Sequence, residues 1–220
     1  MEWPALRLSF VLAVATSLTL LPLALAAARG LARSRWRYKW ILEAALTLPL
    51  VLPPTVLGYY LLVAMGATSP LGVVYERLSG QPLAFSFEGL LLASVIANIP
   101  FAVVPMLRAF EALNPEVLQA ARLCGMTPLR SFVRVELALA WPGILSALVM
   151  TAAHTLGEFG VVLMVGGNIP GETRTAAIAI YDRVQAFDMH GAGLMSAFLL
   201  ATSLVALGLV ARQNRAARGR

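Results

Sequence analysis

Five long stretches of this sequence contain almost no charged residue, and they constrain the fold more than any other feature. In chain order the stretches are 8–28, 44–65, 89–107, 137–166 and 191–211. A helix needs about 20 apolar residues to cross the roughly 30 Å hydrocarbon core of a bilayer, so each stretch is long enough to span a membrane. Only 13% of all residues are charged, against roughly 25% in soluble domains.

The sequence therefore predicts an all-α protein, a polytopic bundle of about five transmembrane helices that forms a single domain over residues 1–220. A sixth, short span within 160–187 is the alternative, although four charged residues in that segment argue against it. Because the chain has two histidines and one cysteine, we expect no dedicated metal site.

Basic residues gather in the segments between alternate spans. Five spans that start from an external N-terminus place thirteen of the seventeen Lys and Arg residues in 29–40, 108–136 and 212–220. Since Lys and Arg are enriched in cytoplasmic loops, we expect the N-terminus outside and the C-terminus in the cytoplasm. The net charge of +6 is then a sign of topology, and we expect no nucleic-acid partner.

A short helix with its own end signals is predicted in the second of these cytoplasmic segments. Asn114 is a favourable N-cap, Pro115 suits the first turn, and Glu116 complements the positive end of the helix dipole. Gly125 can end the helix in the left-handed conformation. Two adjacent alanines would let another protein approach closely; packing of the helix on its own membrane domain is the alternative.

The spacing within this loop resembles a family signature. Gln119-Ala120-Ala121, three residues, Gly125, nine residues and Val135-Glu136-Leu137-Ala138 are similar to the pattern of binding-protein-dependent ABC transporter permeases. That pattern is Glu-Ala-Ala, three residues, Gly, nine residues, Ile, any residue, Leu, Pro, so the chain departs from it at 119, 135 and 138. The resemblance implies a coupling helix at about 114–126, seated in a groove of a separate ATPase subunit. The residues implied at this contact are Glu116, Gln119, Ala120, Ala121, Gly125 and Leu137.

Three further stretches resemble the molybdate branch of this family: 47–60, 156–160 and, most specifically, 168–175. The resemblance covers residues 8 to 211 and implies the fold of a type I ABC importer permease in the cell inner membrane. It implies a homodimer that forms the path for molybdate, with a pair of ABC ATPase subunits and a periplasmic molybdate-binding protein as partners. It also implies that ATP and Mg bind to the ATPase subunits, so that this chain needs no cofactor and is not an enzyme. Tungstate and sulfate permeases are close relatives, and these oxyanions are alternative substrates.

Prolines and polar groups inside the spans are the candidates for the translocation path. Pro49, Pro53 and Pro54 interrupt the second span, and carbonyls freed by proline are tolerated in a bilayer only against protein or a water-filled cavity. We therefore expect the 49–55 segment to face the dimer interior; a kink satisfied by a neighbouring helix is the alternative. Donors without fixed charge suit an ion that must also leave. The path candidates are Pro53, Pro54, Thr55, Asn98, Thr151 and Thr155, of which the polar ones could instead be helix-packing or backbone-bonded groups.

His154 and Glu158 are four residues apart and are therefore neighbours on one helix face. An ionisable pair within a membrane segment is a functional hypothesis. The alternative is a structural pair that joins the fourth span to the 160–187 loop. The family usually has Arg where His154 stands.

The outer loop that begins at Asn168 contains turn-forming residues. Pro170 and Gly171 favour a tight turn, and Glu172 follows them. We expect this loop to form a docking rim for the binding protein; a loop that only closes the vestibule is the alternative.

Two other classes of membrane protein fit the sequence poorly. An intramembrane protease needs a nucleophile and a base in register, but His154 is the only histidine inside a span and no Gly-x-Ser-x-Gly turn occurs. A secondary transporter would carry inverted repeats, which the sequence does not show. No Walker motif occurs either, so we expect no ATPase activity from the chain itself.

Overall fold

The computed structural model describes residues 1–218, and within this range it is entirely helical apart from its loops. The elements in chain order are α1 (Trp3–Arg33), α2 (Lys39–Val51), α3 (Pro54–Met65), α4 (Pro70–Ser79), α5 (Phe87–Glu111), α6 (Pro115–Leu123), α7 (Pro128–Ser131), the π-helical segment η1 (Phe132–Glu136), α8 (Leu137–Gly157), α9 (Gly160–Gly166), α10 (Ala176–Gln185) and α11 (Met189–Arg218). The predicted all-α class is confirmed.

Four continuous helical segments are long and apolar enough to cross a membrane: Trp3–Arg33, Phe87–Glu111, Pro128–Gly157 and Met189–Gly208. The third of these joins α7, η1 and α8 in one run. A fifth crossing exists if the bent pair of α2 and α3 counts as one span. The alternative sixth span is not found among the described residues, because α9 and α10 contain only 7 and 10 residues.

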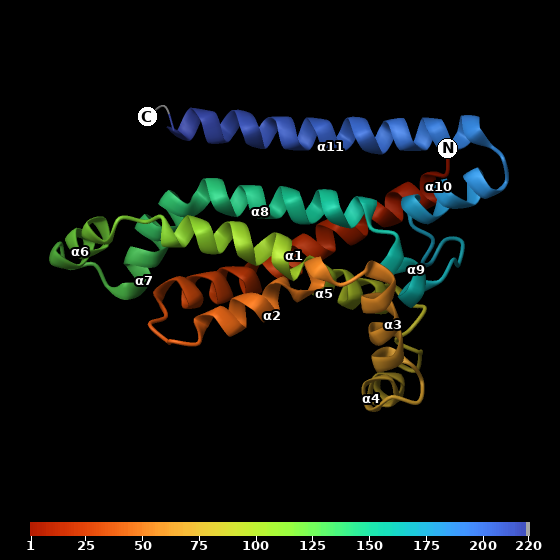
Figure 1. The fold of residues 1–220 in the computed structure, drawn as a ribbon, viewed down its shortest axis with the longest axis horizontal. Helices are drawn as coiled ribbons and strands as arrows, with labels where there is room; N and C mark the ends of the chain where they lie inside the picture. Colours follow the sequence, from red (N-terminus) through yellow and green to blue (C-terminus); the bar gives the residue numbers. More distant parts are fainter. Residues whose placement is uncertain (219–220) are drawn as a thin grey trace.

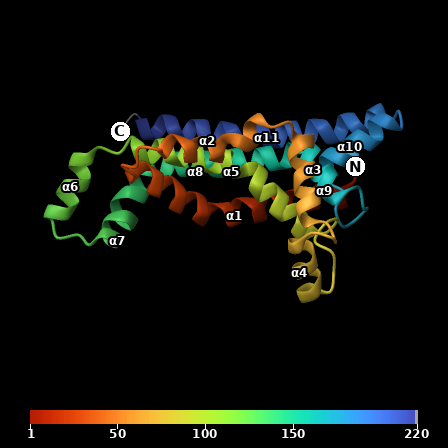
Figure 2. The same ribbon diagram turned by 60° about the horizontal axis from the view of Figure 1, so that its bottom comes forward.

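Three long helices, α1, α5 and α8, lie side by side at the centre of the bundle (Figures 1 and 2). α2 packs against α5, and α11 lies along α8. Buried side chains that include Leu20, Met106 and Ile144 join the three central helices. At Gly143, α8 comes so close to α5 that a Cβ would lie only 2.3 Å from the Cβ of Ala109. Small residues of this kind let transmembrane helices approach closely.

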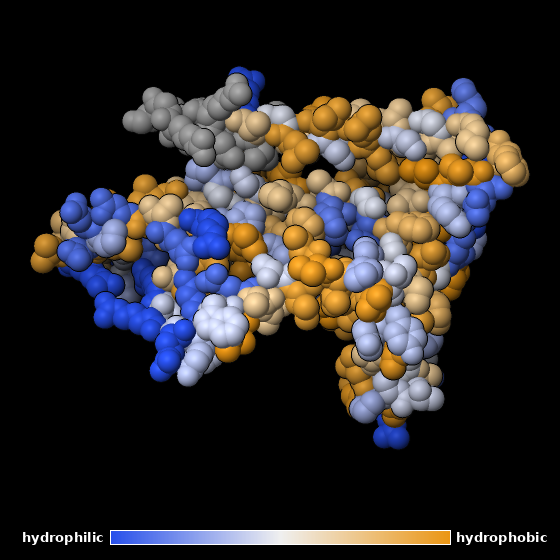
Figure 3. All heavy atoms as spheres, viewed as in Figure 1, coloured by the Kyte–Doolittle hydropathy of each residue, from blue (hydrophilic) through white to orange (hydrophobic). Residues whose placement is uncertain are grey.

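The chain alternates in direction through α1, the α2–α3 pair, α5, α8 and α11, so alternate connections share one end of the bundle (Figure 1). α6 and α7 lie where α1 ends and α2 begins, and α11 returns towards this "α6 end" (Figure 1). Figure 3 shows hydrophilic residues gathered around the α6 end and hydrophobic residues along the middle of the molecule. The basic segments 29–40 and 108–136 therefore share one end, as predicted. The third basic segment, 212–220, extends beyond the described residues.

The second predicted span is bent by 104° between α2 and α3 and is not a straight crossing. The backbone is extended at Leu52 and Pro53, with ψ of 136° and 133°. A proline pushes the residue before it out of the helical conformation, and two successive prolines act here on two successive residues. Pro54 then opens α3, where a missing N–H leaves no helical bond unmade. Pro49 was expected to interrupt the helix as well, but it lies inside α2.

The fourth predicted stretch, 137–166, is also interrupted. α8 ends at Gly157, Glu158 is extended with ψ of 125°, and α9 begins two residues later. The carboxylate of Glu158 accepts a hydrogen bond from the backbone N–H of Val161 at 3.0 Å, so it caps the first turn of α9. The stretch is therefore one long helix followed by a short one.

The two interruptions lie against each other, because α3 packs on α9. A Cβ on Gly160 would lie 2.7 Å from the Cβ of Pro54, and one on Gly58 would lie equally close to the Cβ of Met164. The backbones of the two short helices are therefore in contact at both glycines. A second buried cluster, which includes Leu61 of α3, surrounds this contact.

Candidate functional site

The predicted short helix at the α6 end is present with the expected caps. The side chain of Asn114 accepts a hydrogen bond from the N–H of Glu116 at 2.9 Å. At the other end, Gly125 has φ of +75°, and the N–H of Met126 donates to the carbonyl of Ala121 at 3.1 Å. This is the pattern by which a left-handed glycine ends a helix.

Most of α6 faces away from the rest of the chain. Ala121 is buried against it, whereas Gln119 and Ala120 are exposed. Leu123 is 88% exposed, and Val117 is exposed as well. Figure 1 shows α6 projecting beyond the ends of the long helices. An exposed helix with bare apolar side chains indicates a surface that another protein covers, and the ATPase contact itself stays a prediction.

The second half of the signature lies in η1 and at the start of α8, where it contains a buried carboxylate. Glu136 is 1% exposed, and its oxygens accept hydrogen bonds from Arg29 at 2.8 Å and from Arg33 at 2.5 Å. The Arg29 guanidinium also lies 4.4 Å from the centre of the Phe132 ring. Leu137, the predicted contact residue, is partly buried against the core of the central helices, and its contact with an ATPase stays a prediction. The loop that carries α6 is thus tied to the end of α1.

Asn98, His154 and Glu158 form one polar cluster between α5 and α8. Because the Asn98 carbonyl oxygen can only accept, Nδ1–H of His154 donates to it at 3.1 Å. Nε2 of His154 then faces Glu158 at 3.7 Å from Oε2. The imidazole also stacks on Phe101 with ring centres 4.0 Å apart. His154 is partly exposed, whereas Asn98 and Glu158 are buried, so the cluster meets the surface through its imidazole.

The other path candidates fall into two groups. Thr151 and Thr155 are buried within the chain, and the Thr155 hydroxyl donates to the Thr151 carbonyl at 2.8 Å. The Thr151 hydroxyl has no hydrogen-bond partner among the described residues. Pro53, Pro54 and Thr55 are instead exposed at the bend. The structure therefore does not bring all six candidates onto one surface of the single chain.

The predicted tight turn in the outer loop is present. The N–H of Glu172 donates to the carbonyl of Ile169 at 3.2 Å, and Gly171 has φ of +83°. Proline followed by a residue with positive φ is the arrangement of a type II turn. Pro170, Gly171 and Glu172 are exposed, so the tip of the turn is accessible to a partner.

Asn168 is not at the accessible tip but holds the loop in place. Its side chain donates to Asp182 at 2.8 Å and accepts from Nε of Arg174 at 2.6 Å. Arg174 and Arg183 both pair with Glu2, at 3.7 and 3.3 Å, which connects the loop to the start of α1. The most specific part of the sequence resemblance therefore includes a structural network.

A neighbouring carboxylate, Asp188, opens the last helix. The backbone N–H of Gly191 donates to it at 2.9 Å, and Arg183 forms an ion pair with it. These two contacts hold the pKa of Asp188 below its usual value, the backbone hydrogen bond being the larger cause.

Sequence reasoning missed the role of Glu136 and of the Glu2–Arg174–Arg183 network. Glu136 appeared only as the variable position of the signature. A signal was present, because an acidic residue ends the otherwise apolar and basic run at the close of the basic segment 108–136. Its partners are 103 and 107 residues away, so spacing alone could not identify them.

Comparison with known proteins gives a consistent result. Residues 20–218 match the family model described as "Binding-protein-dependent transport system inner membrane component". The chain is 44% identical over 203 residues to the molybdenum transport system permease protein ModB of Azotobacter vinelandii, covering 92% of this chain and 90% of that protein. It is 37% identical over 226 residues to ModB of Escherichia coli, covering 100% and 97%.

A solved structure shows the same fold. It is a bacterial alginate ABC transporter in complex with an alginate pentasaccharide-bound periplasmic protein, and the match covers 96% of this chain and 77% of that chain. The TM-score is 0.75 at 17% sequence identity, so this likeness concerns the fold alone. With the family model matched over residues 20–218, this chain belongs to the family of binding-protein-dependent transport system inner membrane components.

Proposed function

We propose that this chain is the permease subunit of an ATP-driven importer of molybdate. The single observation that carries the proposal is the near full-length similarity to molybdenum transport permeases, at 44% and 37% identity. Two copies form a homodimer around the path, and two ABC ATPase subunits, which hold ATP and Mg, bind at the α6 end. A periplasmic molybdate-binding protein docks at the opposite end. The complex lies in the cell inner membrane, with the α6 end in the cytoplasm and the N-terminus outside.

The exposed surface of α6 supports its role as the contact for the ATPase. The caps at its two ends hold the helix in place without a partner, and Gln119 and Ala120 are exposed on its surface. The ion pairs of Glu136 with Arg29 and Arg33 connect this loop directly to α1. We infer that ATPase movement reaches the spans through that connection.

The bend at Leu52 and Pro53 supports a dimer with the path at its centre. Pro53 and Pro54 have no N–H to donate to the carbonyls four residues before them. These prolines are exposed in the single chain, and lipid would leave the freed carbonyls unsatisfied. A second copy or a water-filled path would satisfy them. His154, the accessible member of its cluster, is the polar side chain that we place beside this path.

The substrate and the coupling can be tested together in a reconstituted complex. We expect molybdate, delivered by the binding protein, to stimulate ATP hydrolysis in proteoliposomes more than tungstate or sulfate does. If sulfate stimulates hydrolysis and molybdate does not, the substrate is wrong while the permease role stands.

A substitution on α6 separates coupling from folding. Ala120→Arg places an unpaired charge in the proposed contact, and we expect ATPase binding to weaken about tenfold or more, a loss of roughly 1.4 kcal/mol. Ala67→Arg is a matched control, because Ala67 is exposed between α3 and α4, away from α6. Equal ATPase binding by both variants would refute the coupling role of α6.

The chain's one cysteine gives a direct test of orientation. Cys124 is free and exposed directly after α6. We expect a membrane-impermeant maleimide to label it in inside-out vesicles and not in intact spheroplasts, and bound ATPase to protect it. Labelling in intact spheroplasts would reverse the proposed orientation.

A further inference from the structure

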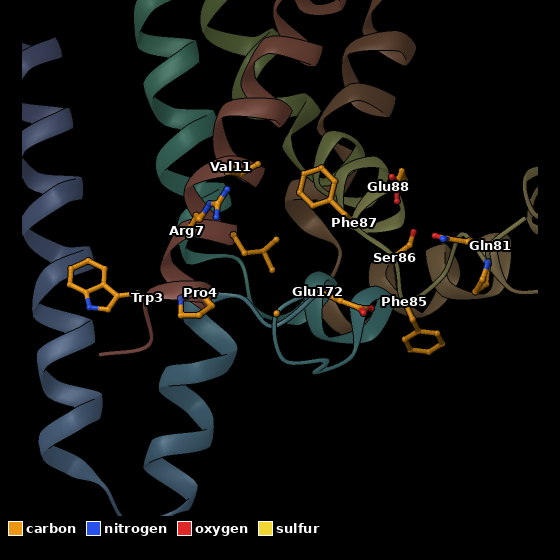
Figure 4. A pocket seen from close by; sticks show the side chains of 13 residues that line it. Trp3, Pro4, Arg7, Val11, Gln81, Phe85, Ser86, Phe87, Glu88 and Glu172 are labelled. Atoms are coloured by element: carbon orange, nitrogen blue, oxygen red, sulfur yellow. The ribbon is translucent and has the colours of Figure 1, made fainter. Parts of the chain in front are cut away.

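A pocket of about 1030 Å³ lies at the end of the bundle opposite α6. It is formed by the start of α1, the loop that leads into α5, and the tip of the outer loop (Figure 4). Trp3, Arg7 and Val11 line it at four-residue intervals, so they share one face of α1. Its wall therefore begins where two apolar helices, α1 and α5, enter the membrane.

Three charged side chains line this pocket, and none of them has an ion-pair partner in residues 1–218. They are Arg7, Glu88 and Glu172, and all three are exposed. Among the described residues, none of the three takes part in the nearby network that pairs Glu2 with Arg174 and Arg183. One cation and two carboxylates thus remain available to a ligand that carries both signs of charge.

The rest of the lining is apolar and includes a strained residue. Leu8, Val11 and Phe87 continue the pocket along the helices, below the charged groups. Phe85 has φ of +64°, a conformation that bulky side chains rarely adopt. Its N–H donates to the Val165 carbonyl at 2.9 Å, which holds the half-exposed ring at the pocket. Backbone strain of this kind concentrates at ligand-binding positions.

We propose that this pocket binds the headgroup and upper acyl chain of a zwitterionic phospholipid. Arg7 pairs with the phosphate, Glu88 and Glu172 pair with the ammonium group, and the acyl chain lies along Leu8 and Val11. Trp3 stands at the pocket rim, and tryptophan favours this interfacial depth. An anionic phospholipid such as phosphatidylglycerol offers no ammonium group to the two carboxylates. The proposal depends on membrane insertion and not on which ion the protein transports.

Fluorescence quenching in a purified permease–ATPase complex tests this site. The variant Trp36→Phe, Trp40→Phe, Trp141→Phe leaves Trp3 as the single tryptophan of this chain. The complex is placed in mixed bilayers in which either phosphatidylethanolamine or phosphatidylglycerol carries brominated acyl chains. We expect brominated phosphatidylethanolamine to quench Trp3 more strongly than its mole fraction in the bilayer predicts. The local enrichment of this lipid should reach up to about fivefold, which is the ratio that exposed ion pairs can give.

Variants identify the groups responsible. We expect Glu88→Gln, Glu172→Gln to remove the preference for phosphatidylethanolamine, and Arg7→Gln to bring quenching by both lipids to the bulk share. The matched control is Glu76→Gln, Arg77→Gln, because these charges are exposed on α4 outside the pocket. Quenching in proportion to bulk composition in the unaltered pocket would overturn the proposal. It would also be overturned if the pocket variants abolish stimulation by the binding protein and leave quenching unchanged, since a protein would then occupy the site.

Discussion

Removal of the buried carboxylate at position 136 tests how the α6 loop is attached to the bundle. In Glu136→Gln the side chain keeps its size but loses its charge, and one of its two acceptor oxygens becomes an amide donor. That donor faces the guanidinium groups of Arg29 and Arg33, which also only donate. Glu136 accepts three hydrogen bonds from the two guanidinium groups. The variant keeps those at its remaining oxygen, replaces those at the other with an unfavourable contact between donors, and loses the attraction between opposite charges.

The size of the effect follows from the burial of the partners. Removal of one member of a buried ion pair costs about 3–5 kcal/mol. Glu136 is 1% exposed, but Arg29 and Arg33 are 28% and 39% exposed, so water can solvate the released guanidinium groups. We therefore expect a loss of about 2–3 kcal/mol in the free energy of unfolding, below the fully buried case. At about 2–4 °C per kcal/mol for a chain of this length, the melting temperature should fall by roughly 5–10 °C.

The assay is thermal unfolding of the detergent-purified protein, followed by tryptophan fluorescence. Glu111→Gln is the matched control, because Glu111 also pairs with two cations at the α6 end, Lys39 and Arg108, but is 28% exposed. An exposed pair contributes at most about 1 kcal/mol, so the control should melt within a few degrees of the unaltered protein. If the two variants lower the melting temperature equally, the burial of Glu136 is not the reason why its ion pairs stabilise the protein. If Glu136→Gln does not fold, Arg33→Gln removes one of the two pairs and should give about half the shift.

Three more predictions concern other parts of the chain. His154→Ala should slow transport more than it reduces assembly with the ATPase, and equal losses in uptake and in co-purification would refute the functional role of the cluster. Gly160→Ala should destabilise the protein by about 1–3 kcal/mol through overpacking, because the new Cβ would lie 2.7 Å from that of Pro54. The control in the same melting assay is Gly157→Ala, because a Cβ at position 157 would have nothing within 4 Å. Because the folded-state pKa of Asp188 is lowered, its contribution to stability is present above the unfolded pKa of about 3.9 and is lost as pH falls through the lower folded pKa. Melting curves of the unaltered protein and of Asp188→Asn should therefore differ at pH 6 to 7 and converge in acid. A difference that persists below the folded pKa would show that the charge of the Asp188 carboxylate is not its source.

Local signals in the sequence predicted the features that depend on neighbours along the chain. Asn114 and Gly125 end α6 as their side-chain and backbone chemistry requires. The Pro170–Gly171 turn follows equally directly from the allowed φ of the two residues. The long apolar stretches identified four of the spans, since only their length and composition matter for crossing a bilayer.

Features that depend on distant residues could not be predicted in this way. The break at Glu158 brings α9 against α3, which is about 100 residues away in the chain, and spacing along the sequence does not identify this contact. Likewise, Asn98 and His154 are 56 residues apart, and only the packing of α5 on α8 brings them within hydrogen-bond distance. Which exposed face would lie against a second copy in the proposed homodimer depends on the surfaces of both copies, and the order of residues in one chain does not determine it.

The glycine contacts between α3 and α9 have a mechanical consequence. Backbones that touch at Gly58 and Gly160 leave no space in which one short helix could slide or tilt independently of the other. The two helices therefore move as one rigid body, attached to α2 by an extended joint at 52–53 and to α8 by a joint at 158–159, where Glu158 is extended. Hinge motion is absorbed by a few residues at the ends of such elements. Because α3 and α9 are in rigid contact, rotation about one joint requires rotation about the other. Any displacement of α3 and α9 relative to the rest of the bundle therefore involves both helices at once.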